Sequence, residues 1–142
     1  MMTRMRTTQR GFTIIELVVV LAIIGLMLSF VMISTQGIQE KNRDNKRLSD
    51  MNEIQKALGL YYSDYGKFPA SVNGTVITGD DDVSQALEDD LLISETPRDP
   101  LHPTYTYTYQ TDVGGSTYSL SFCLETDRYA DYASGCGNTI AP

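Results

Sequence analysis

The chain has 142 residues, a formal net charge of −7 and 42% hydrophobic residues, which fits one modest domain plus any segment outside it. Residues 1–11 hold three arginines and no acid, so the rest of the chain has 8 basic against 18 acidic residues. An acidic body of this kind excludes nucleic-acid binding through a general basic surface. Two cysteines and one histidine fall short of the usual four-ligand zinc set.

The first predicted element is a helix that begins in an apolar run. From Phe12 to Ile33 the sequence has 22 residues and one charged residue, Glu16. At about 1.5 Å per residue, such a helix would be ~33 Å long, enough to cross the core of a bilayer. A carboxylate there costs roughly 2.5–3.5 kcal/mol or more, which makes Glu16 a candidate functional residue. No small-residue cleavage site follows Ile33, so we expect the apolar segment to stay in the mature protein.

The helix is predicted to continue without a break, because no proline occurs before Pro69. We expect it to run from Phe12 to about Tyr62, with a mixed-charge, solvated stretch at "QEKNRDNKR". A stripe of larger apolar residues then repeats at spacings of three and four: Leu48, Met51, Ile54, Leu58, Tyr61 and Tyr65. This second half can pack on a small domain, whereas the first half must be buried in lipid or in copies of itself.

The start of the helix resembles the signature of type IV prepilins and type II secretion pseudopilins. In "RGFTIIELVVVLAIIG", Gly11 precedes the cut, Phe12 follows it, and Glu16 is the acid at the fifth mature position. The stretch "RLSDMNEIQKALGLYYSDYGKFP" resembles the second half of that family's long helix. The resemblance implies that a dedicated membrane peptidase cuts between Gly11 and Phe12 and methylates the new amino group.

The resemblance also implies assembly. Subunits of this family wait in the cytoplasmic membrane as single-pass proteins and then stack into an extracellular filament. The implied partners are further copies of the chain, related minor pilins, the prepilin peptidase, membrane lipid and, indirectly, the assembly platform with its ATPase motor. In such a filament the Glu16 carboxylate would meet the positive amino terminus of a neighbouring Phe12. A buried pair of this kind sets register more than it stabilises.

After Pro69 the composition shifts to glycine, asparagine, aspartate, threonine and tyrosine. Asn73–Gly74 predicts a hairpin turn, and we prefer this to the N-glycosylation pattern that the same residues fit. The stretch "SQALEDDLL" predicts a short helix capped by Ser84 or Asp82. The three prolines of "TPRDPLHP" are expected to hold that stretch extended, with His102 structural or exposed.

The clearest strand signal is the alternation of aromatic or apolar residues with threonine or serine around Gly114–Gly115. It predicts a β-hairpin with one face on the helix. The alternating residues are Tyr105, Tyr107 and Tyr109 in the first run and Tyr118, Leu120 and Phe122 in the second. The tyrosine row could also stack on sugars or bases, but we favour an amphipathic strand.

Cys123 and Cys136 close a C-terminal loop. In an exported chain an even count favours a disulfide, whereas in the cytosol the pair would stay reduced. The position resembles the disulfide-bounded loop of many pilins. Acidic residues crowd the loop and are weak calcium candidates, although solvated surface acids are the preferred interpretation: Glu125, Asp127 and Asp131.

These features predict an α+β protein in which a long N-terminal helix packs on a small antiparallel β-sheet head. The expected segments are a cleaved leader (1–11), a transmembrane or filament-core half of the helix (12–35), its amphipathic half (36–66) and the head (67–142). No nucleophile–base pattern, phosphate loop or metalloprotease motif is present, so we expect neither enzymatic activity nor a cofactor.

The function predicted first is a structural subunit of a type IV pilus, used for adhesion, twitching motility or DNA uptake. The alternative is a pseudopilin of a type II secretion or competence system. A third hypothesis, from another class, is a single-span surface protein that does not polymerise.

Overall fold

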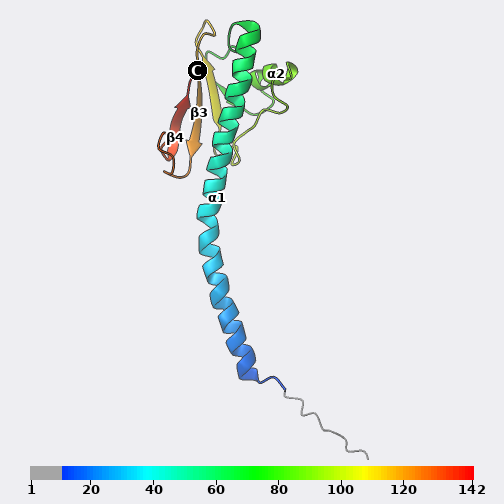
Figure 1. Cartoon of the computed structure of the whole chain (residues 1–142), viewed down its shortest axis with the longest axis vertical. Coiled ribbons are helices and arrows are strands. Elements are labelled where there is room, and N and C mark those ends of the chain that lie inside the picture. Colours follow the sequence, from blue (N-terminus) through cyan, green and yellow to red (C-terminus); the bar gives the residue numbers. More distant parts are fainter. Residues whose placement is uncertain (1–10) are drawn as a thin grey trace, which may run out of the picture. The chain divides into compact units, whose positions relative to one another are not determined.

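A computed structural model describes residues 11–142, and for residues 30–36 it describes the backbone alone. The elements follow in the order α1 (Ile14–Tyr65), β1 (Thr75–Ile77), α2 (Asp82–Asp89), β2 (Tyr107–Thr111), β3 (Tyr118–Leu124) and β4 (Gly135–Ile140) (Figure 1). The chain divides into two compact units, Met1–Ile38 and Gln39–Pro142. The expected leader, apart from Gly11, lies outside the described residues.

Helix α1 begins two residues later and ends three residues later than expected. Its end is marked by Gly66, whose φ of 67° lies in the left-handed region and whose N–H donates to the Tyr62 carbonyl at 2.8 Å. A glycine in this conformation satisfies a carbonyl of the last turn and stops the helix without steric strain. The physical end of α1 is therefore Gly66, three residues before the first proline.

The strands form one antiparallel sheet in the order β1-β2-β3-β4. The predicted hairpin is confirmed, with Tyr109 opposite Leu120 and Thr111 opposite Tyr118. At its turn the Gly115 carbonyl accepts the Phe68 N–H at 2.8 Å, and a Cβ on Gly115 would lie 3.1 Å from the Phe68 carbonyl oxygen. The turn thus also fixes the chain where it leaves α1. The α+β architecture is as predicted.

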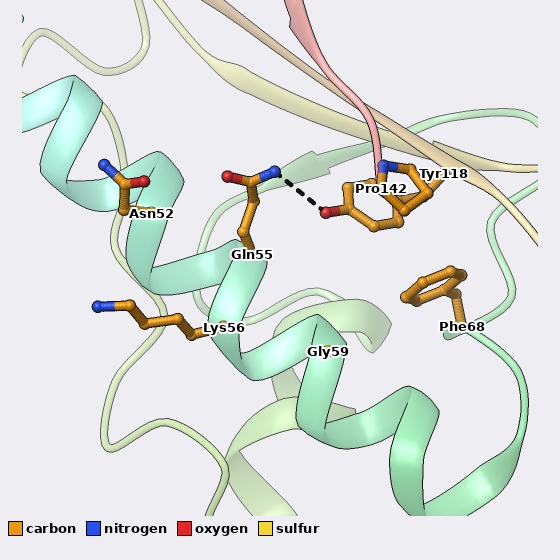
Figure 2. A pocket seen from close by; sticks show the side chains of 7 residues that line it. All are labelled: Asn52, Gln55, Lys56, Gly59, Phe68, Tyr118 and Pro142. Carbon is orange, nitrogen blue, oxygen red and sulfur yellow. Dashed lines mark hydrogen bonds between the residues drawn. The ribbon is translucent and has the colours of Figure 1, made fainter.

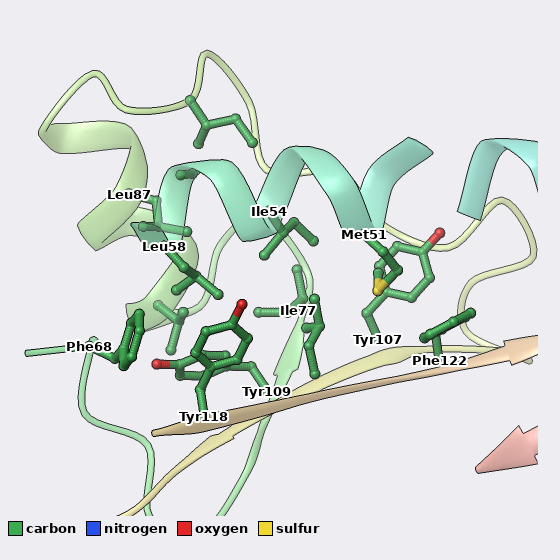
Figure 3. Close-up of a cluster of buried hydrophobic side chains, with 14 of the residues drawn as sticks. Met51, Ile54, Leu58, Phe68, Ile77, Leu87, Tyr107, Tyr109, Tyr118 and Phe122 are labelled. Carbon is green, nitrogen blue, oxygen red and sulfur yellow. The ribbon is translucent and has the colours of Figure 1, made fainter. Parts of the chain in front are cut away.

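The core of the second unit lies between α1 and the sheet (Figure 3). The helix stripe contributes Met51, Ile54 and Leu58, each with no exposed surface. From the sheet and the segments around it come Phe68, Ile77, Leu87, Tyr107, Tyr109, Tyr118, Leu120 and Phe122. Burial of each large apolar side chain contributes roughly 1.5–3 kcal/mol, so this interface is the main source of stability.

The alternating tyrosines are core residues. Tyr107 and Tyr109 are completely buried, and the Tyr109 hydroxyl donates to the Pro69 carbonyl at 2.9 Å. Burial raises the pKa of both phenols, and the Asp50 carboxylate raises that of Tyr107 further. Tyr105 lies before the strand, with its ring over the Arg47 guanidinium at 5.1 Å. The amphipathic-strand interpretation is confirmed for Tyr107 and Tyr109 and is wrong for Tyr105, which lies outside β2.

Helix α2 is present, but its cap is neither of the residues expected. The Asp81 carboxylate accepts the N–H groups of Val83 and Ser84 at 3.2 and 3.0 Å, and also the Ser84 hydroxyl. Asp81 has the extended backbone that an N-cap requires, whereas Asp82 and Ser84 are already helical. The Asp81 carboxylate can accept two backbone N–H groups at once, which makes this residue a better N-cap than Ser84.

Two further expectations about the head are wrong. Asn73–Gly74 forms a turn that leads into β1. However, β1 pairs with β2, which follows α2 in the chain, and not with the residues before the turn. The proline-rich stretch is not extended throughout, because the His102 N–H donates to the Asp99 carbonyl at 3.0 Å and the Thr104 N–H to the Leu101 carbonyl at 2.8 Å. His102 is exposed, as expected.

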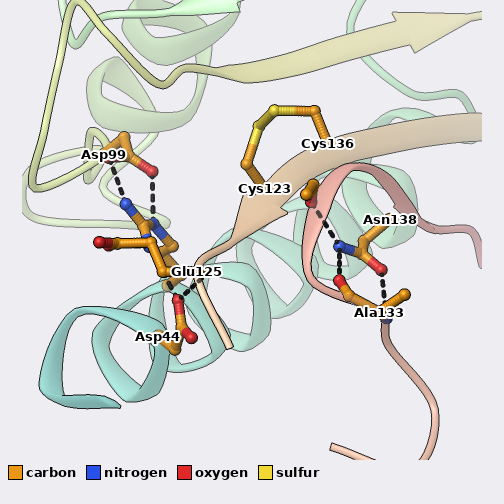
Figure 4. The surroundings of a disulfide bond; sticks show 9 residues. Asp44, Asp99, Cys123, Glu125, Ala133, Cys136 and Asn138 are labelled. Atoms are coloured by element: carbon orange, nitrogen blue, oxygen red, sulfur yellow. Dashed lines mark hydrogen bonds and ion pairs between the residues drawn. A yellow bond between two sulfur atoms is a disulfide. The ribbon is translucent and has the colours of Figure 1, made fainter. Parts of the chain in front are cut away.

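The C-terminal segment holds strand β4, where the sequence predicted only a loop. Its glycines gave no strand signal, yet it pairs with β3 along the sheet edge, with Ile140 opposite Leu120. Cys123 and Cys136 face each other in this pair and form a disulfide (Figure 4). Asn138 closes the same segment by accepting the Ala133 N–H and donating to the Ala133 carbonyl. The disulfide therefore joins two paired strands as well as bounding a loop.

Replacing Cys136 with serine should lower the free energy of unfolding of the 39–142 unit by ~3 kcal/mol. Without the bond, the unfolded chain regains the conformational entropy that closing a loop between two cysteines 13 residues apart removes. Guanidinium denaturation of the oxidised unit measures this loss. Reducing agent should lower the unmodified unit to the same value and leave the variant unchanged. An unmodified unit that is equally stable with and without reductant would contradict the expected role of the bond.

Candidate assembly site

The N-terminal segment begins with three residues, Gly11–Thr13, that precede α1. Thr13 caps the helix: its Oγ1 accepts the Glu16 N–H at 3.3 Å, and its carbonyl accepts the Leu17 N–H at 3.2 Å. Glu16 therefore lies in the first turn, where the positive end of the helix dipole favours a carboxylate. The expected cleavage point, between Gly11 and Phe12, lies outside the helix.

The apolar side chains of the first unit are exposed on every face of the helix. From Phe12 to Leu28, the large apolar side chains retain between 42% and 83% of their exposed surface. No charge other than Glu16 interrupts them in this range. A helix that is apolar all round requires cover from lipid or protein. In the part of the chain that the structure describes, no helix is both long enough and apolar enough to cross a membrane.

The second unit contains a buried charge cluster where the sequence predicted a solvated stretch. Asp44, Arg47 and Asp50 of "QEKNRDNKR" and its continuation have no exposed surface, so that expectation is wrong for the inward face of the helix. The spacing gave the missing signal: positions 44 and 47 continue, towards the N-terminus, the three-and-four repeat of Met51, Ile54 and Leu58. A charged residue on the buried stripe needs a partner from elsewhere in the fold.

Arg47 joins three parts of the unit through the carboxylates of Asp44, Asp99 and Glu125, which are labelled in Figure 4. Its Nε and Nη2 donate to the two carboxylate oxygens of Asp99, at 2.8 and 3.2 Å. Its Nη1 donates to Asp44 at 2.8 Å and to Glu125 at 2.6 Å. Burial alone would lower the pKa of Arg47, but the hydrogen bonds that it donates to Asp99, Glu125 and Asp44 outweigh burial and raise the pKa. The guanidinium therefore stays charged in the core.

The carboxylates around Arg47 are also held by other donors. Asp44 accepts the backbone N–H groups of Glu125 and Thr126, both at 2.9 Å, and so fixes the chain directly after β3. Glu125 receives the Arg43 guanidinium as well as that of Arg47. A buried ion pair stabilises only when its remaining donors and acceptors are satisfied, and here they are. The cluster fixes α1 to the end of β3 and to the loop that holds Asp99.

A second buried acid extends this cluster along α1. Asp50 accepts the Tyr107 hydroxyl at 2.9 Å and pairs with Lys46 on the helix surface. The strand β2 is thereby joined to the same helix face as β3.

The three weak calcium candidates do not converge. Glu125 is held by Arg43 and Arg47, Asp127 accepts the Ser134 N–H at 2.6 Å, and Asp131 is exposed. The Ser134 hydrogen bonds lower the pKa of Asp127, so that carboxylate has a structural partner. Within the described residues, no group of three or more acidic, histidine or cysteine side chains could hold a metal ion.

Two known families match the chain. Residues 6–32 match the family described as "Prokaryotic N-terminal methylation motif", and residues 35–127 match "Type II secretion system (T2SS), protein G". The second match covers more than half of the chain and includes the whole buried charge cluster. No solved structure matches the chain.

Curated relatives agree with these families. The type II secretion system core protein G of Vibrio cholerae is 30% identical over 116 residues, which cover 80% of this chain and 79% of that protein. The protein of the same name from Pectobacterium carotovorum is 36% identical over 66 residues, or 46% of this chain and 42% of its own length. Toxin coregulated pilin of Vibrio cholerae is 29% identical over 73 residues, which cover 51% of this chain and 33% of that pilin. The chain spans about half the length of the first curated relatives that it matches.

The chain therefore belongs to the type II secretion system protein G family, within the superfamily of type IV pilins and pseudopilins. It is a structural protein and not an enzyme. The sequence predicts a type IV pilus subunit first and a pseudopilin as the alternative, whereas the comparisons favour the pseudopilin.

Replacing Asp44 with alanine should lower the free energy of unfolding of the 39–142 unit by ~3 kcal/mol or more. The change removes a partner of the buried Arg47 and leaves the N–H groups of Glu125 and Thr126 without their acceptor. The matched control is Asp64→Ala, an exposed aspartate on the same helix, which should change stability by less than about 0.5 kcal/mol. Similar values for the two variants in urea denaturation would contradict the structural role of Asp44.

Acid should destabilise this unit partly through Glu125. Hydrogen bonds from Arg43, aided by those from Arg47, lower the pKa of Glu125 below its usual 4.5. A carboxylate with a lowered folded pKa contributes stability above its unfolded pKa, and that stability is lost as pH falls through the folded value. Thermal unfolding between pH 7 and pH 2 should therefore show a steeper loss below about pH 4.5 in the unmodified unit than in Glu125→Gln. Parallel curves would show that Glu125 titrates as a free carboxylate.

Proposed function

We propose that this chain is a pseudopilin, a structural subunit that polymerises into a fibre of a type II secretion or related system. The observation that carries the proposal is the apolar surface of the first unit, exposed on all faces from Phe12 to Leu28 with Glu16 as its one charge. Membership of the protein G family supports the secretion system as its setting. A type IV pilus remains the second candidate function, supported by the partial match to toxin coregulated pilin.

The proposed maturation begins at the start of the chain. A prepilin peptidase cuts between Gly11 and Phe12 and methylates the Phe12 amine. The methylation motif over residues 6–32 supports this, as does the position of the bond before the first helical residue, Ile14, because a peptidase needs non-helical backbone at the bond that it cuts. Residues 12–35 then hold the subunit in the cytoplasmic membrane until an assembly platform, driven by its ATPase, transfers it to the fibre.

In the proposed fibre, residues 12–35 of neighbouring subunits cover one another. The Glu16 carboxylate pairs with the Phe12 amino group of a neighbour, which stays positive after methylation. Desolvation cancels most of the attraction in such a pair, but a wrongly placed subunit would leave two buried charges without partners. The pair therefore selects the register of assembly more than it contributes to its strength.

Replacing Glu16 with glutamine should abolish fibre formation while leaving processing intact. The amide keeps the size of the side chain and accepts hydrogen bonds, but it cannot neutralise the neighbouring amine, a loss of roughly 3–5 kcal/mol per subunit. The measurement is the ratio of sheared fibre to processed membrane subunit in cells that express the variant as the only copy. Intact mass spectrometry checks that both proteins begin at a methylated Phe12.

The control for this experiment is Thr35→Val, a conservative change at the far end of the same segment, which should assemble normally. Wild-type fibre yield from Glu16→Gln would contradict the pairing. A subunit that still begins at Met1 would contradict the proposed processing.

A further inference from the structure

One leucine of the second unit has a left-handed backbone and an exposed side chain, and no contact within the unit accounts for either. Leu91 follows α2 with a φ of 56° and is 89% exposed. Its N–H donates to the Glu88 carbonyl, and the N–H of Leu92 donates to the Leu87 carbonyl, which together form a Schellman motif. Glycine is the usual residue at this point, because a left-handed backbone strains a residue with a Cβ by roughly 1–2 kcal/mol. Strain together with full exposure of a leucine points to an interaction outside the chain.

An apolar groove of suitable character lies on another part of the same unit. It occupies about 350 Å³ between α1 and the end of the sheet (Figure 2). Phe68, Tyr118 and Pro142 line one side, and Asn52 and Gln55 of α1 line the other. Gly59 leaves part of the helix side open, with no atom within 4 Å of a Cβ built there. The rings of Phe68 and Tyr118, together with the absence of a side chain at Gly59, leave room for one aliphatic side chain in this groove.

Charges near the two features are complementary. Leu91 follows Asp89 and Asp90, both exposed, and Asp90 accepts the Tyr65 hydroxyl at 3.0 Å. The groove has Lys56 at its rim. Among the described residues, the ion pairs involve Arg43, Lys46 and Arg47 and do not involve Lys56. A leucine that enters the groove from a second molecule would bring Asp89 towards this lysine.

We propose that Leu91 of one copy of this chain inserts into the Gly59–Phe68–Tyr118 groove of the next copy, with Asp89 facing Lys56. Within the second unit, α2 and the C-terminus lie on opposite sides of α1 (Figure 1). Because the two surfaces differ, the contact is heterologous, and a heterologous contact that does not close into a ring repeats as a filament. This inference rests on the proposed polymerisation and gives the heads a contact separate from that of residues 12–35.

The test is Leu91→Gly in the full-length chain, with fibre yield and head stability both measured. Glycine suits the left-handed backbone, so the thermal midpoint should stay the same or rise, and misfolding cannot explain a loss of fibres. Fibre yield should fall about tenfold or more, as expected for loss of one buried leucine contact in each subunit. The matched control is Val113→Gly, which removes an 88% exposed side chain from the β2–β3 turn and should leave the yield unchanged.

A charge exchange tests the partners that the proposal assigns. Lys56→Asp should lower the fibre yield, and adding Asp89→Lys in the same chain should restore it. Normal yield from Leu91→Gly, an equal loss from Val113→Gly, or no rescue by the double exchange would each overturn the contact. If the unmodified chain formed no fibres, the proposed polymerisation itself would fail, and this contact with it.

Discussion

The second unit depends on one buried cation. Arg47 has no exposed surface and hydrogen-bonds to the carboxylates of Asp44, Asp99 and Glu125, which come from α1, the loop before β2 and the end of β3. A guanidinium is suited to this position because it stays charged and presents donors in several directions from one plane. Apolar contacts between α1 and the sheet provide most of the free energy of folding, but they are not directional. The ion pairs specify how far along α1 the sheet and the loop attach.

Helix α1 has an exposed N-terminal stretch and a C-terminal stretch with one buried face. In the described part of α1, the buried residues come from position 44 onwards, and residues 14–28 are exposed. Under the proposed function, lipid covers these apolar side chains before assembly and other subunits cover them after it. In the polar stretch 39–47, Asp44 and Arg47 face the core, whereas residues such as Lys41 and Asn45 are exposed to solvent. The charge cluster thus lies where the buried part of α1 begins.

The elements that can be predicted from the sequence are those in which one periodicity has one physical cause. The three-and-four repeat from Leu48 to Tyr65 and the alternation around Gly114–Gly115 predicted the helix face, the hairpin and most of the core. The predictions were wrong where contacts with residues far away in the sequence determine the local structure. Nothing local to "QEKNRDNKR" shows that Asp99 and Glu125 will surround Arg47, and β4 forms in a glycine-rich segment because β3 and a disulfide hold it. The same limit applies to Asp81, which is a better cap than its neighbours only once the chain direction before α2 is known.

The most direct measurement is a double-mutant cycle on the 39–142 unit with Arg47→Met, Asp99→Leu and the pair. If Arg47 fixes the loop to α1 through a bidentate ion pair, Arg47→Met leaves the Asp99 carboxylate buried without its guanidinium, and Asp99→Leu leaves two guanidinium donors without their acceptors, whereas the double change removes both members of the pair. The predicted result in chemical denaturation is a coupling free energy of about 2 kcal/mol or more, with the double variant more stable than the sum of the single changes implies. Additive effects within about 0.5 kcal/mol would contradict the view that this ion pair determines how the head attaches to its helix.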